Sequence, residues 1–354
     1  MDTEKKIAFI DVSNFEKLLD NLSQEREVFV PQAVENSVKG TFYSYEKRTP
    51  EKEFCYAGFR PSQSLKTFMF DGRMKVAEYP SEEDTMPVAK PRAVVGAAAC
   101  DIVSLKSLDA VFLQEEFTDI FYQQRRNDTL LVSEDCTEPR ETCLCTLAGH
   151  CPYSKEGYDL NLSKVKGGYL VEAGSEKGAE VMKQNASLFS PSSMSLLDER
   201  DRNRTEVTGK VEEINKEYAV SKNRKELLEI QRESEDWHEH VQNCIECGAC
   251  LFSCPTCHCF ILYDQAGDTS AFQRVKKWDV CVYAGFSKMA GGGTPRFGIM
   301  ERFRHRYLHK FEYFPKNFDI EACTGCGRCI EGCMGKIDMR KVFKALDTAT
   351  AGAR

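Results

Sequence analysis

The sequence has no excess of basic residues. Its 48 lysines and arginines stand against 55 aspartates and glutamates, which gives a net charge of −7. Proteins that bind nucleic acid usually carry a basic surface, because that surface has to neutralise phosphates. The composition therefore argues against this class, and we predict no nucleic-acid partner.

Long apolar segments are also missing. The N-terminal stretch MDTEKKIAFIDVSNF has no apolar core behind a basic start, and the longest run of small apolar residues, 93–100, is too short to cross a bilayer. We therefore expect no membrane insertion and a cytoplasmic location.

Several catalytic sequence motifs are absent as well. The chain has no G-x-G-x-x-G for a dinucleotide, no G-x-S-x-G nucleophile elbow and no nickel-type Cys-x2-Cys pairs at both ends. We therefore predict no catalytic residues in this chain.

Cysteine, in contrast, is abundant, with 17 residues among 354. Eight of them form two runs with the same C-x2-C-x2-C-x3-C spacing, at 244–254 and 323–333. This spacing is typical of two-cluster ferredoxins, in which three cysteines of a run bind one 4Fe–4S cluster and the fourth, at the start of a helix, binds the other. The predicted ligands are Cys244, Cys247, Cys250 and Cys333 for cluster 1, and Cys323, Cys326, Cys329 and Cys254 for cluster 2.

The remaining segments predict two or three units with separate cores. Strand-like and helical segments alternate before residue 190, which indicates an α/β domain, and charged residues dominate the segment after it. We expect an α/β domain over 1–190, a charged helical linker over 191–235, an α+β two-cluster ferredoxin-like domain over 236–345 with a large insertion at 260–318, and a flexible tail over 346–354.

Four cysteines of the first domain predict a third 4Fe–4S cluster. Cys100 ends an apparent strand, and Cys136, Cys143 and Cys145 lie in a loop that follows another strand. Parallel strands present their carboxyl ends at one edge of a sheet, so these four side chains can meet there. Cys151 is a reserve ligand. Zinc bound by the same sulfurs, or a set of buried unreactive thiols, remains an alternative.

Four cysteines lie outside these ligand sets. We expect Cys257, Cys259 and Cys281 to pack against the clusters, and the isolated Cys55 to be a core thiol. An alternative is that Cys257 or Cys259 replaces Cys254 as a ligand, although the proline directly after Cys254 favours the usual choice.

The insertion contains RFRHRYLHKFEYFP at 302–315, where basic and aromatic residues alternate. Such a stretch could bind nucleic acid through phosphate contacts and stacking. We favour a helix whose aromatic residues face inward while its arginine and lysine side chains lie over the surface.

Several of these segments together resemble one known family. They are CIECGACLFSCPTCHCF (244–260), WDVC (278–281), AGGGTPR (290–296), RHRYLHKF (304–311), CTGCGRCIEGC (323–333), ACDIVSLKSLDAVFL (99–113), TLLVSEDCTEP (129–139), TCLC (142–145), GYDLNL (157–162) and GYLVEAGSEKG (168–178). The chain resembles the beta, iron–sulfur subunit of cytosolic sulfhydrogenases and the corresponding 4Fe–4S dicluster subunit of anaerobic sulfite reductases. The resemblance covers most of residues 85–340 and is looser over 1–80.

The resemblance implies a non-catalytic electron relay within a multi-subunit oxidoreductase. Its partners would be a flavin subunit that exchanges hydride with NAD(P)H, and a catalytic or further iron–sulfur subunit of a hydrogenase, a sulfite reductase or a heterodisulfide-reductase-like enzyme. Met334 departs from the family, which has proline after the fourth cysteine, so local rigidity rather than ligation is affected.

Two other functions remain open. The first-domain cysteines could carry out thiol or substrate chemistry of their own, which would make the chain catalytic. The cysteine runs could instead bind zinc in a structural adaptor, which would be colourless, whereas an iron–sulfur protein is brown.

Overall fold

The structure is a computed structural model that describes residues 6–35, 40–49, 51, 53–80, 90–267 and 271–352. Contacts divide the chain into two compact units. The first contains the described residues of 1–65, 87–214 and 324–326, and the second those of 66–86, 215–323 and 327–354. Both units combine helices and strands, so the predicted mixed α/β content is confirmed.

The first unit is built on an eight-stranded sheet in the order β3-β2-β5-β6-β7-β8-β1-β9. Its central neighbours β2, β5, β6 and β7 run parallel, and the outer pairs run antiparallel. The strands are β1 (Ile7–Asp11), β2 (Glu27–Val34), β3 (Phe42–Lys47), β5 (Arg92–Ala98), β6 (Thr129–Glu134), β7 (Leu160–Val165), β8 (Gly168–Ala173) and β9 (Ser190–Pro191).

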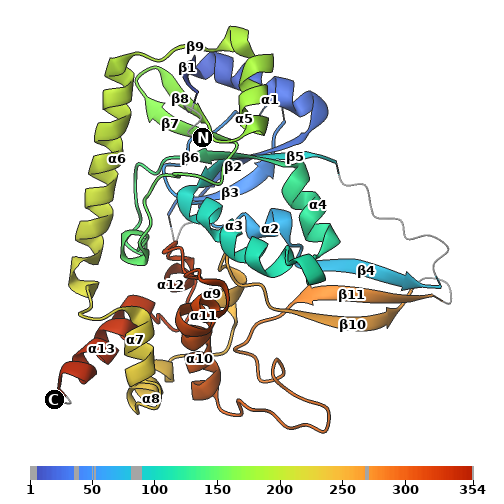
Figure 1. The fold of residues 1–354 in the computed structure, drawn as a ribbon, viewed down its shortest axis with the longest axis vertical. Helices are drawn as coiled ribbons and strands as arrows, with labels where there is room; N and C mark the ends of the chain where they lie inside the picture. The colour runs from blue at the N-terminus through green and yellow to red at the C-terminus, as the bar shows by residue number, and fades with distance from the viewer. Residues whose placement is uncertain are drawn as a thin grey trace. The chain divides into compact units, whose positions relative to one another are not determined.

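Helices cover both faces of this sheet, as Figure 1 shows. They are α1 (Val12–Glu25), α3 (Ala99–Phe112), α4 (Ile120–Asp128), α5 (Glu176–Gln184) and α6 (Met194–Asn215), with short turns at Glu115–Phe117, Thr146–Ala148 and Ala186–Leu188. Helix α1 begins where the Asp11 side chain accepts from the Asn14 backbone NH, and it buries one apolar face. That face joins alternate residues of the strands, such as Val95 and Val132, in a single core.

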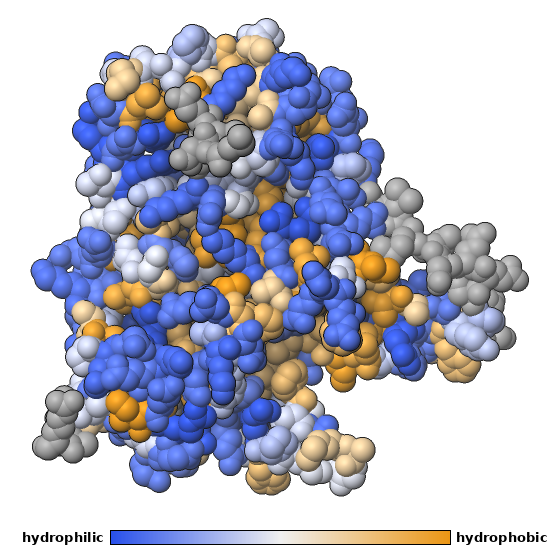
Figure 2. All heavy atoms as spheres, in the orientation of Figure 1, coloured by the Kyte–Doolittle hydropathy of each residue, from blue (hydrophilic) through white to orange (hydrophobic). Residues whose placement is uncertain are grey.

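The second unit contains a three-stranded antiparallel sheet in the order β10-β11-β4. Its strands are β4 (Arg73–Tyr79), β10 (Phe260–Ala266) and β11 (Phe272–Trp278). Apolar side chains on β10 and β11 remain exposed, with 50% of Leu262 and 61% of Phe272 accessible. Figure 2 shows apolar patches on the visible face of this sheet.

Short helices surround the cysteine runs of the second unit. They are α2 (Lys66–Met69), α7 (Arg224–Ile230), α8 (Asp236–Val241), α9 (Ala249–Phe252), α10 (Ile299–Leu308), α11 (Phe314–Phe318), α12 (Arg328–Glu331) and α13 (Met339–Gly352), with a short turn at Lys216–Tyr218 and a π-helical turn at His309–Tyr313 between α10 and α11. Across the described part of the chain, none of the helices has both the length and the apolar character needed to span a membrane.

The division into units differs from the boundaries expected from the sequence. Helix α6 lies in the expected linker, yet nearly all of it belongs to the first unit. Strand β4 pairs with β11 and therefore belongs to the second unit, although the two strands are far apart in sequence. The expected tail is also different, because residues 346–352 continue helix α13, while 353–354 lie outside the described residues.

Candidate functional site

The two cysteine runs adopt the same local conformation. Gly248 and Gly327 have φ angles of 71° and 72°, and each directly precedes a one-turn helix, α9 or α12. Two residues earlier, Glu246 and Gly325 also have positive φ, at 56° and 67°. A positive φ is costly for a residue with a side chain, so Glu246 adopts it only because the surrounding loop requires it. The two loops therefore share one defined shape.

The fourth cysteine of each run lies elsewhere than expected. Each helix carries the third cysteine and ends before the fourth, so Cys254 and Cys333 follow a helix instead of starting one. The backbone NH of Ile337 points to the Cys333 sulfur at 3.4 Å, which fixes this side chain although Met334 replaces the usual proline.

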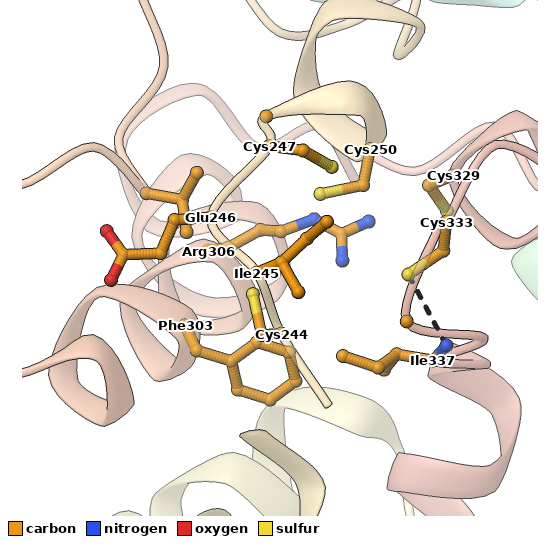
Figure 3. A pocket seen from close by; sticks show the side chains of 13 residues that line it. Cys244, Ile245, Glu246, Cys247, Cys250, Phe303, Arg306, Cys329, Cys333 and Ile337 are labelled. Carbon is orange, nitrogen blue, oxygen red and sulfur yellow. Dashed lines mark hydrogen bonds between the residues drawn. The ribbon is translucent and has the colours of Figure 1, made fainter. Parts of the chain in front are cut away.

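The predicted ligands of cluster 1 line one pocket in the second unit. Figure 3 shows the sulfur atoms of Cys244, Cys250 and Cys333 turned toward the same space. The pocket is lined by Cys244, Ile245, Glu246, Cys247, Gly248, Cys250, Val282, Phe303, Arg306, Cys329, Cys333, Gly335 and Ile337. All four predicted ligands are therefore brought together, with Cys329 as an additional cysteine at this pocket.

Close backbone packing joins the two runs at this pocket. A Cβ added to Gly335 would lie 2.0 Å from the carbonyl oxygen of Asn243, so only glycine fits there. Asn243 directly precedes Cys244, and Gly335 follows Cys333 by two residues. The contact therefore places the last cysteine of one run beside the first cysteine of the other, as cross-ligation requires.

Cys254, a predicted ligand of cluster 2, lies among buried polar groups. The Lys310 Nζ lies 3.4 Å from its sulfur, and the Thr256 Oγ1 lies 3.2 Å from it. A hydrogen bond from Cys257, together with the positive charges of Lys310 and Lys66, lowers the pKa of the Cys254 thiol well below its usual value. The same pairing raises the pKa of Cys257. Because iron binds the thiolate, this environment favours Cys254 over Cys257 as the ligand.

The other extra cysteines of this unit pack beside the runs. Cys257, Cys259 and Cys281 join an apolar cluster that also contains Cys244 and Cys250. A hydrogen bond with Cys259, followed by burial, raises the pKa of the Cys281 thiol. The three side chains therefore pack beside the cysteine runs, as expected.

The basic and aromatic stretch in the insertion differs from its prediction in one respect. Its aromatic residues, such as Phe303 and Tyr307, are buried as expected. Arg302, Arg306 and Lys310 are also buried, whereas we expected them over the surface. The reason is that they lie on the face of α10 and the following turn that contacts backbone carbonyls and cysteines.

The four cysteines proposed for the third cluster line a pocket in the first unit. Strands β5 and β6 are parallel neighbours, so Cys100 after the first and Cys136 after the second reach the same edge of the sheet. The pocket is lined by Phe59, Arg60, Ala99, Cys100, Cys136, Pro139, Cys143, Cys145, Cys151, Pro152, Val211, Gly325 and Cys326. The structure thus brings the predicted set together and adds Cys151 and Cys326.

Hydrogen bonds hold the Cys136 loop in place. The buried Asp135 accepts from Ser163 at 2.6 Å, from Asn161 at 3.0 Å and from the Arg204 Nε of helix α6 at 2.7 Å. The Cys136 backbone NH donates to the carbonyl oxygen of Pro152 at 2.8 Å. From the sequence, the charged residues of α6 were expected in a helical linker, so the contact of Arg204 with Asp135 was not predicted.

Cys326 has a different neighbourhood from the rest of its run. It packs with Cys100 and Cys136 in a small buried cluster of the first unit. Its carbonyl oxygen accepts from Arg60, and the Leu144 NH donates to the neighbouring Gly325 carbonyl at 2.8 Å. Cys323, Cys329 and Cys254 belong to the second unit, so the ligand set of cluster 2 stays a prediction.

The chemistry of both donor sets fits iron–sulfur clusters. Burial, followed by the charges of Cys143 and Cys145, raises the pKa of the Cys136 thiol well above its usual value. Burial likewise raises the pKa of Cys145 to about 12. Several thiolates can share such a dry pocket only when a cationic metal compensates their charge.

Single-ion sites have a different geometry. Four thiolates around one zinc lie roughly 3.8 Å apart, because each Zn–S bond is about 2.3 Å long. No group of three or more histidine, cysteine or acidic side chains in the described ranges is arranged to hold one metal ion. A cubane places its thiolates on separate irons, which are farther apart.

Three half-buried histidines form a cluster beside the Cys254 region. The ring centroids of His258 and His309 are 5.6 Å apart, and those of His305 and His309 are 6.0 Å apart. Burial lowers the pKa of His305 to about 4 and that of His309 to about 3. The rings are therefore uncharged at neutral pH.

We expect this histidine cluster to make the fold sensitive to acid. Since the pKa of His309 is lower in the folded chain, the unfolded chain binds more protons, and the stability present above pH 6.5 is lost as the pH falls. At pH 5, one such imidazole favours unfolding by about 2 kcal/mol. His309→Gln should flatten the fall in unfolding free energy between pH 7 and 5, measured by denaturant titration. The exposed His238→Gln is the control, and equal slopes for wild type and H309Q would contradict the expectation.

The comparisons with known proteins agree with this geometry. The profile of the 4Fe-4S dicluster domain family matches residues 243–337. Sulfhydrogenase 2 subunit beta of Pyrococcus furiosus is 32% identical over 251 residues, which cover 70% of this chain and 72% of that protein. The chain belongs to this family of iron–sulfur beta subunits. The family membership confirms the predicted resemblance and makes the chain a 4Fe–4S electron-transfer subunit of the oxidoreductase type.

Proposed function

We propose that this chain relays single electrons through three 4Fe–4S clusters inside a multi-subunit oxidoreductase. The observation that carries the proposal is the convergence of cysteines at two pockets, one in each unit, together with the repeated loop conformation of the two runs. The proposed ligands are Cys244, Cys247, Cys250 and Cys333 for cluster 1, Cys323, Cys326, Cys329 and Cys254 for cluster 2, and Cys100, Cys136, Cys143 and Cys145 for cluster 3.

Cys151 is less suited than the other four cysteines of the first-unit pocket. Its thiol shares a hydrogen bond with the Tyr153 hydroxyl. Tyr153 in turn lies under the Arg204 guanidinium, 4.6 Å from the ring centroid. This arrangement holds Cys151 in a separate contact, which supports Cys100, Cys136, Cys143 and Cys145 as the ligand set.

The role of the protein is to place the clusters and to control their surroundings. When bound, the clusters supply reversible one-electron chemistry, whose potential depends on charge, hydrogen bonds to sulfur and solvent exposure. At the first pocket, the apolar lining of Ile245, Val282 and Phe303 and the Ile337 NH control these quantities.

The proposed partners are a flavin subunit that uses NAD(P)H and a second redox subunit. The relative named above is, by its name, a subunit of a sulfhydrogenase, so a hydrogenase or a sulfur-reducing partner is the first choice. The exposed apolar side chains of β10 and β11 support a subunit role, since exposed apolar patches commonly mark protein interfaces.

Iron analysis of anaerobically purified protein tests the proposal. Three clusters predict about twelve irons and a similar amount of acid-labile sulfide per chain, a brown colour, and a paramagnetic signal after reduction with dithionite. About eight irons would limit the chain to the dicluster domain. Colourless protein with bound zinc would support the structural adaptor instead.

Thiol chemistry at the first-unit cysteines is the second candidate function. The observation that favours it is the presence of six first-unit cysteines, Cys326 among them, at a pocket where one cluster needs four. A free cysteine beside three bound ones would leave an open iron corner or a reactive thiol. Alkylation of native holoprotein by iodoacetamide should then label at least one of Cys100, Cys136, Cys143 and Cys145, whereas a complete cluster protects all four.

A further inference from the structure

Two buried cations lie one turn apart on the same helical face of the second unit. Arg306 in α10 is 9% exposed, and Lys310 in the π-helical turn is 5% exposed. Like charges at this spacing destabilise a helix, and burying each charge costs additional free energy. Such a pair persists only where negative charge lies close to both side chains.

Arg306 points into the pocket of cluster 1. Figure 3 shows its guanidinium between the side chains of Cys250 and Cys333. Its Nε is buried and has no hydrogen-bond partner among the described residues. Burial alone would lower the pKa of Arg306, but the neighbouring Cys250 and Cys329 charges raise it. The groups that face this guanidinium are therefore cysteine sulfurs, which carry negative charge when they bind a cluster.

Lys310 faces a different cysteine. Its Nζ donates to Thr256 Oγ1 at 2.7 Å and to the Ala322 carbonyl oxygen at 2.8 Å. The third contact of the ammonium group is the Cys254 sulfur at 3.4 Å. Lys310 thus supplies an N–H···S contact to a predicted ligand of cluster 2, while Arg306 serves cluster 1.

We propose that Arg306 and Lys310 are positioning counter-charges that raise the reduction potentials of the two ferredoxin-type clusters, Arg306 for cluster 1 and Lys310 for cluster 2. The inference rests on the proposed function. Reduction adds one electron, and so one negative charge, to a cluster without making or breaking a bond. A fixed cation in dry surroundings stabilises the reduced form more than the oxidised form.

Placing both cations on one helix has a consequence for electron transfer. Each cluster has one buried positive charge beside it. The two cations therefore raise both reduction potentials and do not separate them. An electron can then leave either cluster without meeting a large uphill step. Removing one cation should separate the two potentials.

Potentiometric titration of the loaded protein, followed by paramagnetic resonance, tests this inference. At each site the cation is replaced by Gln, which keeps polarity, and by Met, which keeps volume. At a fixed potential, the ratio of reduced to oxidised cluster should fall at least tenfold, a shift of about 59 mV for one electron. One midpoint should move in R306Q and R306M, and a different one in K310Q and K310M. Lys316→Met on α11 removes an exposed charge and should move neither.

The outcomes separate the inference from the proposed function. Unchanged midpoints in iron-loaded Arg306 and Lys310 variants would overturn the inference and leave the relay intact. The neutral variants could bind no iron at the affected cluster while R306K and K310R do. The site would then require the positive charge, and this result would support the inference. A wild-type protein without iron would overturn the proposed function itself.

Discussion

Replacing Cys136 with alanine is expected to remove about four of about twelve irons per chain and to leave the other two clusters in place. The reason is that Cys136 lines the first-unit pocket together with Cys143 and Cys145, and burial, followed by the charges of these two, raises the pKa of its thiol. A cubane that loses one of four thiolates in this pocket can turn only to Cys151, because the other nearby cysteine, Cys326, is assigned to cluster 2. Iron and sulfide analysis, with spin quantification after reduction, measures the loss.

Cys55→Ala provides the matched control for this experiment. Cys55 belongs to the same unit, but its thiol shares a hydrogen bond with Tyr43, and it does not line the pocket. The control should keep the iron content of the wild type. Full iron content in Cys136→Ala would show that the first-unit cysteines bind no cluster through Cys136. Full content in C136A but a loss in the double variant with Cys151→Ala would identify Cys151 as the replacement ligand.

The meeting of Cys100 and Cys136 could be predicted from the sequence because it depends on local patterns alone. Each follows a short apolar strand, and parallel strands share one edge of the sheet. The cysteine spacing similarly predicts that Cys244, Cys247, Cys250 and Cys333 meet, and all four line the pocket in Figure 3. In both places, the signal is a short local pattern around each cysteine, even where the cysteines that meet are distant in sequence.

The buried cations could not be predicted in the same way. Arg306 and Lys310 look like surface residues of an amphipathic helix, because burial of a cation is disfavoured without a partner. Their partners, such as Cys250 and Cys254, lie more than 50 residues away in sequence. The pairing of β4 with β11 has the same origin, since strand pairing between distant segments leaves no local signal.

Gly335→Ala is expected to abolish cluster 1 while the first-unit cluster is retained. The added Cβ would lie 2.0 Å from the Asn243 carbonyl oxygen, so the two backbones must separate. This separation moves Cys333 away from Cys244. It should also lower the free energy of unfolding by about 2 kcal/mol or more. Iron analysis should show a loss of about four irons, and thermal unfolding should show a lower midpoint.

The clash is with backbone, so the effect cannot be relieved by rotating a side chain. Gly209 in helix α6 has no atom within 4 Å of an added Cβ, so Gly209→Ala should bind iron normally and gain roughly 0.5–1 kcal/mol from helix propensity. A Gly335→Ala protein with full iron content and unchanged stability would mean that the two cysteine runs do not need this close approach. Cross-ligation by Cys333 would then lose its structural support.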